Sequence, residues 1–215
     1  MKVVQIPNGV FAENCYLVVD EQARECAIID PGEEAGLILH KVEETGARPV
    51  AIWLTHAHLD HVLGVARVAR ETGASIWLHP ADRPLYDAVP DQVAWFGLAQ
   101  PEGGPLPAPD AEMVPGQRLR IGQLSLDIRH TPGHSPGSVC LLGPGVAFTG
   151  DVLFAGSIGR TDLPGADFET LIGSIERELL SLSDDTIVYS GHGPETTIGR
   201  ERAANPFLTG AYRIV

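Results

Sequence analysis

The stretch Ile52-Trp53-Leu54-Thr55-His56-Ala57-His58-Leu59-Asp60-His61 begins as an apolar run and ends with three histidines and an aspartate within six positions. Imidazole nitrogens and carboxylate oxygens are ligands that zinc- and iron-class ions accept. Residues two apart in an extended segment point to the same side, so His56 and His58 can hold one ion together. From Asp60 onward the spacing suits the first turn of a helix, which would turn Asp60 and His61 toward a second ion. The stretch therefore predicts a strand that delivers a metal site.

The composition is that of a globular protein that does not bind nucleic acid. The chain has 215 residues, 44% of them hydrophobic and 20% charged, and we expect a single domain over residues 1–215 with an ample core. The formal net charge of −13, with only 15 lysines and arginines, argues against a nucleic-acid partner. Because no apolar run has the length of a membrane span and the N-terminus lacks the apolar region of a signal peptide, we expect a cytoplasmic protein with no membrane partner.

Hydrophobic periodicity predicts two similar β-rich halves. In the first half we expect strands 3–6, 15–19, 26–29, 50–54 and 75–78 with helices 33–45, 60–72 and a short helix 81–88. In the second half we expect strands 118–121, 124–128, 138–142, 146–149 and 186–189 with helix 167–180. Two such halves, stacked sheet on sheet with their helices outside, give an α/β (α+β) fold with the four layers of an αββα sandwich.

Between the halves, residues 89–112 are predicted to form a long loop without regular structure, because five prolines and three glycines fall within them. Loops of this length in compact domains are often functional. Trp95 and Phe96 could therefore close over an apolar part of a substrate, or they could pin the loop to the body of the domain.

Three further candidate ligands follow predicted strands of the second half. His134 comes after a Pro-Gly turn, Asp151 follows Gly150, and His192 has a glycine on each side. Together with the four ligands of the opening stretch they make seven, which is enough for two metal ions.

These residues resemble the motif set of the metallo-β-lactamase superfamily, and the resemblance covers nearly the whole chain. Within that superfamily the chain is similar to the hydroxyacylglutathione hydrolase (glyoxalase II) group. The further matches to that group are Phe148-Thr149-Gly150-Asp151, Gly156-Ser157-Ile158-Gly159-Arg160-Thr161-Asp162, and Thr197-Ile198-Gly199-Arg200-Glu201 before Asn205-Pro206.

The resemblance implies a binuclear metal site. It implies that one divalent ion is held by His56, His58 and His134, that the other is held by Asp60, His61 and His192, and that Asp151 bridges them. Zinc is the expected metal, and iron and manganese suit the same ligands.

The activity that the resemblance implies is metal-dependent hydrolysis. A metal-bridging hydroxide would cleave a small-molecule substrate, a hydroxyacylglutathione-like thioester or a related ester. Asp60 and Asp151 are the expected catalytic residues, since Asp60 can orient the hydroxide as well as ligate. We expect a monomer or a homodimer.

The chain departs from glyoxalase II after His192, where only 23 residues remain. The helical extension that carries much of the glutathione platform in glyoxalase II therefore has no counterpart, and the resemblance does not extend to glutathione recognition. Arg160, nine residues after Asp151, could bind a substrate carboxylate or could pair with Asp162.

Two other activities share these ligands. A mononuclear-iron persulfide dioxygenase would use His56, His134 and Asp151 as a facial triad. A lactone hydrolase would use the same two-metal chemistry on another ester. We favour thioester hydrolysis because residues 190–199 look more like the short hydrolase-like members.

Overall fold

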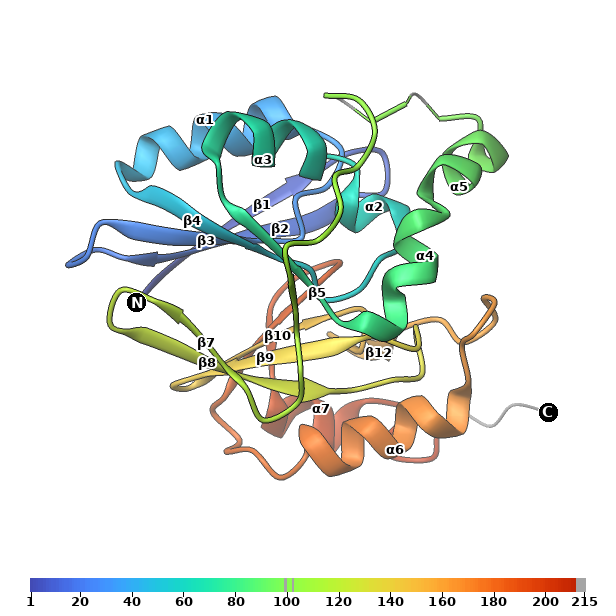
Figure 1. Ribbon diagram of the computed structural model, residues 1–215. Helices are drawn as coiled ribbons and strands as arrows, with labels where there is room; N and C mark the ends of the chain where they lie inside the picture. Colours follow the sequence, from blue (N-terminus) through green and yellow to red (C-terminus); the bar gives the residue numbers. More distant parts are fainter. Residues whose placement is uncertain (99, 102, 212–215) are drawn as a thin grey trace.

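The computed structural model describes residues 1–98, 100–101 and 103–211, and two six-stranded sheets lie face to face within it (Figure 1). The first sheet contains, in spatial order, β1 (Lys2–Asn8), β2 (Glu13–Asp20), β3 (Glu25–Ile29), β4 (Arg48–Trp53), β5 (Ser75–Leu78) and β6 (Ala111–Glu112). The second contains β14 (Thr196–Thr197), β13 (Ile187–Ser190), β10 (Val146–Gly150), β9 (Val139–Gly143), β8 (Leu124–His130) and β7 (Arg118–Ile121).

Helices cover the outer face of each sheet (Figure 1). Helices α1 (Ala35–Thr45) and α3 (Val65–Thr72) lie over the first sheet, and α6 (Phe168–Glu178) and α7 (Ile198–Ala204) lie over the second. The remaining elements are α2 (Leu59–Val62), the short turn of helix η1 (Pro80–Asp82), α4 (Arg83–Asp87), α5 (Val89–Phe96) and the two-stranded ribbon of β11 (Leu153–Phe154) and β12 (Ser157–Ile158).

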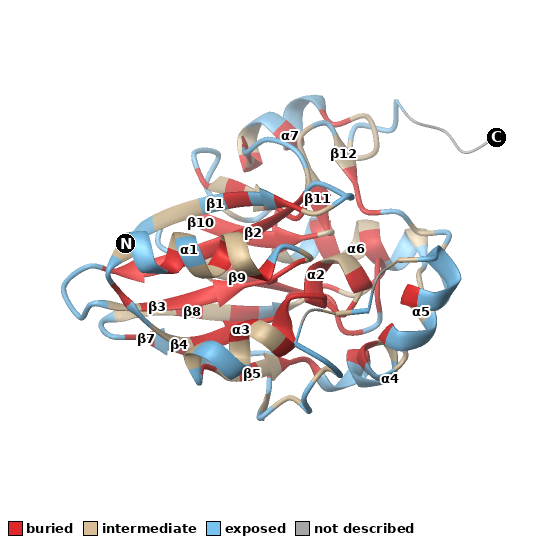
Figure 2. Cartoon of the chain, turned by 90° about the horizontal axis from the view of Figure 1, so that it is seen from above, coloured by how far each residue is buried: buried red, intermediate tan, exposed pale blue. Residues whose placement is uncertain are grey.

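Strand β2 shows how the layers are built, because all of its residues are buried. Leu17 and Val19 belong to the apolar cluster under α1 and α3, whereas Tyr16 and Val18 belong to the cluster between the two sheets. A third cluster joins the second sheet to α6 through residues such as Leu171. Three apolar layers separate four layers of backbone, and the predicted αββα sandwich is confirmed. The strands are largely buried and the outer helices partly exposed (Figure 2).

The prediction of no regular structure in residues 89–112 was wrong, because Val89–Phe96 form helix α5 and Ala111–Glu112 form β6. Pro90 lies in the first turn of α5, where a missing N–H costs nothing, and Gly97 ends the helix in a left-handed conformation with φ 65°. Val89 and Val93 are fully buried and hold α5 against the first sheet's helical layer. Tertiary burial thus overrides the unfavourable composition.

The predicted helix 60–72 is divided into α2 and α3 at Leu63 and Gly64. The Gly64 N–H donates to the carbonyl oxygen of Pro31 at 3.0 Å, and a Cβ atom on Gly64 would lie 2.3 Å from the carbonyl oxygen of Gly32. The turn after β3 therefore presses against the chain here, and the helix bends around it. This contact fixes α2, which begins directly after His58.

The structure also contains elements that were not predicted, namely the β11–β12 ribbon, β14 and α7. Each is shorter than the windows in which periodicity is measurable. Within the part of the chain that the structure describes, no helix has the length and apolar character needed to cross a membrane.

We predict that Gly64→Ala lowers the free energy of unfolding by about 1–3 kcal/mol, because the methyl group would overlap a backbone carbonyl that cannot move aside. The matched control is Gly173→Ala in α6, where an added Cβ meets nothing within 4 Å. That change should raise stability by up to about 1 kcal/mol through helix propensity. Denaturant titration of both variants measures the difference, and equal stabilities would contradict the close approach at Gly64.

Candidate metal centre

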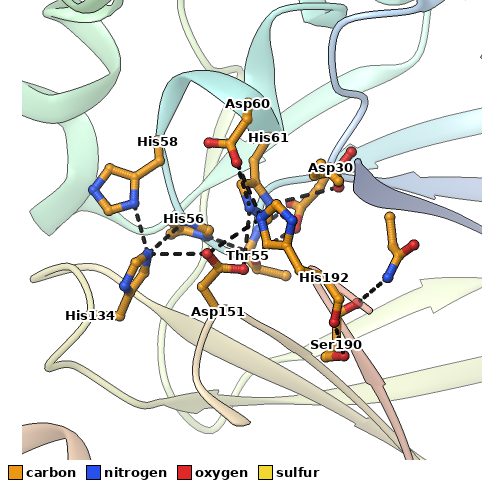
Figure 3. A network of polar contacts seen from close by, with 12 residues as sticks. Asp30, Thr55, His56, His58, Asp60, His61, His134, Asp151, Ser190 and His192 are labelled. Carbon is orange, nitrogen blue, oxygen red and sulfur yellow. Dashed lines mark hydrogen bonds and ion pairs between the residues drawn. The ribbon is translucent and has the colours of Figure 1, made fainter. Parts of the chain in front are cut away.

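The seven predicted ligands converge from four loops that leave the same edge of the sandwich (Figure 3). His56 and His58 lie in the loop after β4, and Asp60 and His61 lie in α2. The other three follow strands of the second sheet: His134 after β8, Asp151 after β10 and His192 after β13. Each loop leaves its strand at a point where the backbone ladder ends, so its side chains are free to turn inward.

Three imidazoles form the first cluster. The Nδ1 atom of His58 lies 2.8 Å from Nε2 of His134, and the same Nε2 lies 3.2 Å from Nε2 of His56. Three nitrogen atoms, one from each residue, lie within 4.8 Å of one another. Neutral imidazoles have little reason to gather in this way, because nitrogen lone pairs that face one another repel unless a cation or a proton lies between them.

The second cluster combines one carboxylate with two imidazoles. The Oδ2 atom of Asp60 lies 3.2 Å from Nε2 of His192 and 3.8 Å from Nε2 of His61. These three residues also offer one ligand atom each within 4.8 Å of one another.

Asp151 lies between the two clusters and contacts both (Figure 3). Its Oδ2 is 3.5 Å from Nε2 of His134 and 3.7 Å from Nε2 of His192, while its Oδ1 is 3.4 Å from Nε2 of His61. A single carboxylate with an oxygen toward each cluster is the geometry that a bridging ligand requires.

Unsatisfied polar atoms test whether this donor set fits a cation. Among the described residues, the buried side-chain atoms without a hydrogen-bond partner include Nε2 of His61 and Oδ1 of Asp151, which face each other. Buried polar atoms normally have partners, and leaving them without one costs free energy. A divalent cation between the clusters would satisfy both atoms, so the residues fit a metal centre.

Two histidines of the first cluster are neutral, whereas the bridging carboxylate is ionised. Burial, reinforced by the neighbouring imidazoles, lowers the pKa of His58 to about 3 and that of His56 well below its usual range. Both rings are therefore neutral at pH 7, which is the form that binds a metal. Burial alone would raise the pKa of Asp151, but the surrounding histidines, His61 foremost, hold it well below the ordinary value, so its carboxylate is ionised.

In the second cluster the carboxylates favour the protonated form of both imidazoles. Burial lowers the pKa of His61, but the carboxylates of Asp151 and Asp60 more than offset it and raise the pKa well above its usual value. The pKa of His192 is raised as well, by Asp60 and Asp151 against burial. Metal binding here must release protons.

Two buried aspartates that sequence reasoning did not assign to the site hold its loops in place. The first is Asp30, which directly follows β3. Its carboxylate accepts hydrogen bonds from the Thr55 N–H at 2.7 Å and the Thr55 hydroxyl at 2.6 Å, and it lies 3.1 Å from Nδ1 of His61. Asp30 therefore orients His61 so that Nε2 faces the site. Its place at a strand end was the signal that could have revealed it.

The second is Asp82 at the end of η1, which is fully buried. One carboxylate oxygen accepts hydrogen bonds from the Ala57 N–H at 3.0 Å and from the Ser135 hydroxyl at 2.7 Å, and the other accepts from the Gly137 N–H at 2.5 Å. Ala57 separates His56 from His58, and Ser135 follows His134. Asp82 thus ties together the two loops that supply the first cluster, a long-range contact that no sequence pattern indicates.

A pocket of about 700 Å³ opens directly above the clusters. His58, Asp60, His134, Asp151 and His192 line its floor. Arg160, the predicted substrate contact, lines the wall, but its guanidinium donates two hydrogen bonds to the carboxylate of Asp162, at 2.7 and 2.9 Å. The structure therefore contains the ion pair that the sequence left as an alternative.

Comparison with known proteins identifies relatives over nearly the whole length of the chain. The family description "Metallo-beta-lactamase superfamily" matches residues 8–192. A protein of Haemophilus influenzae named hydroxyacylglutathione hydrolase GloC is 42% identical over 212 residues, which are 97% of this chain and 98% of that protein.

Two solved structures are similar in fold and sequence. The crystal structure of the BLEG-1 B3 metallo-β-lactamase superposes with a TM-score of 0.89 at 40% identity, covering 97% of this chain and 100% of its own. The structure of TTHA1623 in a di-iron-bound form has a TM-score of 0.87 at 43% identity, covering 95% of this chain and 100% of its own. One of these neighbours thus holds two metal ions.

We predict that Asp82→Asn weakens metal binding by about 10- to 100-fold, the usual cost of losing a group that orients ligands. An asparagine has one acceptor oxygen where Asp82 has two, so one backbone N–H would face an amide nitrogen. The measurement is competition with a chelator of known affinity. Asp87→Asn is the matched control, because this exposed carboxylate pairs only with Arg83 on the same helix among the ion pairs of the described residues. Equal metal affinity in the two variants would contradict the role of Asp82.

Proposed function

The chain belongs to the metallo-β-lactamase superfamily, and from this premise we propose that it is a metal-dependent hydrolase that cleaves a small-molecule thioester. The observation that carries the proposal is the pair of ligand clusters joined by Asp151 at the floor of an open pocket. Two metal ions side by side under a substrate-sized cavity are the arrangement of hydrolytic binuclear sites.

We propose the ligand division that the distances support. His56, His58 and His134 would hold one ion, Asp60, His61 and His192 the other, and Asp151 would bridge them. When bound, such ions acidify a shared water to a nucleophile at neutral pH and polarise the carbonyl that it attacks. Zinc suits these ligands, and the di-iron form of TTHA1623 makes iron the other metal to test.

The chain's own groups position the reactants. Asp60 lies at the pocket floor and its Oδ2 is 3.2 Å from His192, so its second oxygen is available to accept a hydrogen bond from the attacking water. Asp151 and Asp60 both remain ionised and offset the charge of the ions. Because a thiolate is a good leaving group, a thioester needs no dedicated general acid, and the remaining polar groups on the floor are already ligands.

The proposal of a thioester is supported by the relative named hydroxyacylglutathione hydrolase, which aligns over 97% of this chain. A mononuclear-iron persulfide dioxygenase is less well supported. A single ion held by His56, His134 and Asp151 would leave the residues of the second cluster without a metal to bind. Lactone hydrolysis would use the same floor, and a substrate panel distinguishes it.

We predict that protein purified without added metal carries two ions per chain and releases free thiol from S-lactoylglutathione or from simpler thioesters. The measurement is elemental analysis together with a panel of thioesters, lactones and glutathione persulfide. One iron per chain with oxygen uptake on the persulfide would reject the hydrolase in favour of the dioxygenase, and turnover of lactones alone would move the assignment to that ester class.

We predict that His58→Ala loses metal from the first cluster and lowers kcat/KM by at least about 100-fold, more than the loss of an orienting group would cost. The fold should persist, because the His58 side chain is only partly buried and its ring contacts the other proposed ligands His56 and His134. The control is His40→Ala on α1, an exposed histidine whose ion pair is with Glu44. Full activity of His58→Ala, with an unchanged circular dichroism spectrum, would refute the ligand assignment.

A further inference from the structure

Above the metal floor, the pocket has an aromatic wall that the proposed chemistry does not use. The wall consists of Phe11, from the turn between β1 and β2, and of Trp95 and Phe96, from the end of α5. The Phe11 and Phe96 rings meet edge to face with centroids 6.0 Å apart, and the Trp95 and Phe96 rings lie 5.3 Å apart. Segments more than 80 residues apart in the chain thus build one continuous aromatic surface beside the ligands.

Other residues of α5 provide most of its anchorage. Trp95 is 78% exposed and Phe96 is 51% exposed, whereas Val89 and Val93 on the same helix are fully buried and provide its anchorage. Exposed aromatic surface of this size is costly in water unless something covers it. Because these side chains line the pocket, their position fits contact with the substrate.

The charges around the pocket are unsuited to a strongly anionic group. Outside the proposed ligands, the charged residues among the described lining of the pocket are Asp91 and Arg160. Arg160 is already paired with Asp162 through two hydrogen bonds. Away from the proposed metal ions, a substrate with several carboxylates would meet one neutralised cation and one acid in the pocket lining.

We propose that the substrate carries an apolar group that packs on Phe11, Trp95 and Phe96, so that the site selects thioesters with an apolar acyl or thiol part over charged ones. This inference rests on the proposed thioester hydrolysis. Leu85 and Leu163 also line the pocket and add to its apolar surface. The ions would act on the thioester carbonyl while the wall supplies binding free energy away from the reacting atoms.

The test uses the metal-loaded enzyme and two series of thioesters. One series varies the acyl chain from two to eight carbons on a fixed neutral thiol, N-acetylcysteamine, and the other varies the alkyl thiol under a fixed acetyl group. Each buried methylene should raise kcat/KM by about two- to fourfold, because burial of a methylene stabilises by about 0.8 kcal/mol. The series that rises identifies which part of the substrate lies on the wall.

Trp95→Ala tests the wall itself. The ratio of kcat/KM between the longest and shortest members of the rising series should fall by about tenfold in this variant. The matched control is Val114→Ala, which truncates another exposed apolar side chain, 48% exposed and outside the pocket lining, and should leave the ratio unchanged. A ratio that does not rise with chain length, or that survives in Trp95→Ala, overturns the inference.

Binding of alkyl thioethers, which have no carbonyl to hydrolyse, separates this inference from the proposed function. Calorimetry should show that an S-hexyl thioether binds at least about tenfold more tightly than its S-methyl analogue, and that Trp95→Ala removes the difference. If no thioester is cleaved but this preference holds, the apolar site stands and the thioester reaction falls. If thioesters are cleaved without any such preference, the reaction stands and the apolar site is refuted.

Discussion

The carboxylate of Asp151 must lie within reach of imidazoles from both sheets, and much of the sandwich follows from that requirement. Asp151 leaves β10 in the middle of the second sheet, whereas His61 is carried by the loop after β4 of the first. The two sheets can approach here only where side chains are absent: a Cβ on Gly150 would lie 2.3 Å from the Thr55 hydroxyl, and one on Gly191 would lie 2.7 Å from Cε1 of His61. These glycines therefore let two sheets share one site.

Two further buried carboxylates fix the relative positions of the ligand loops. Asp30 joins the end of β3 to Thr55 and His61, and Asp82 joins η1 to the loops around His56 and His134. Burying a carboxylate is costly unless hydrogen bonds compensate it, and both residues have several. They restrict the ligand loops to the arrangement in which the nitrogens and oxygens face one another.

The sequence was sufficient for the layers and for the convergence of the seven ligand side chains, because both depend on local patterns. Short apolar runs between turn signals marked the strands, and metal-binding residue types stood at strand ends. The sequence was insufficient where contacts between residues far apart in the chain determine the local structure. Helix α5 was missed because Pro90 and its neighbours argue against regular structure, while the burial of Val93 that stabilises the helix involves residues elsewhere in the chain. Asp82 was missed for the same reason, since its partners are 25 and more positions away.

The floor of the pocket is charged and its wall is apolar, and different elements of the fold supply the two. The floor gathers charges and is built on strand ends that the buried layers hold rigid. The wall is apolar and comes from the β1–β2 turn and α5, which lie outside the two sheets. Apolar surroundings lower the local dielectric constant and so would strengthen the interactions of the floor carboxylates with the metal ions that we propose they hold. Because the wall is not part of either sheet, its side chains can change without moving a ligand. One metal floor can then serve substrates that differ only in what lies against the wall.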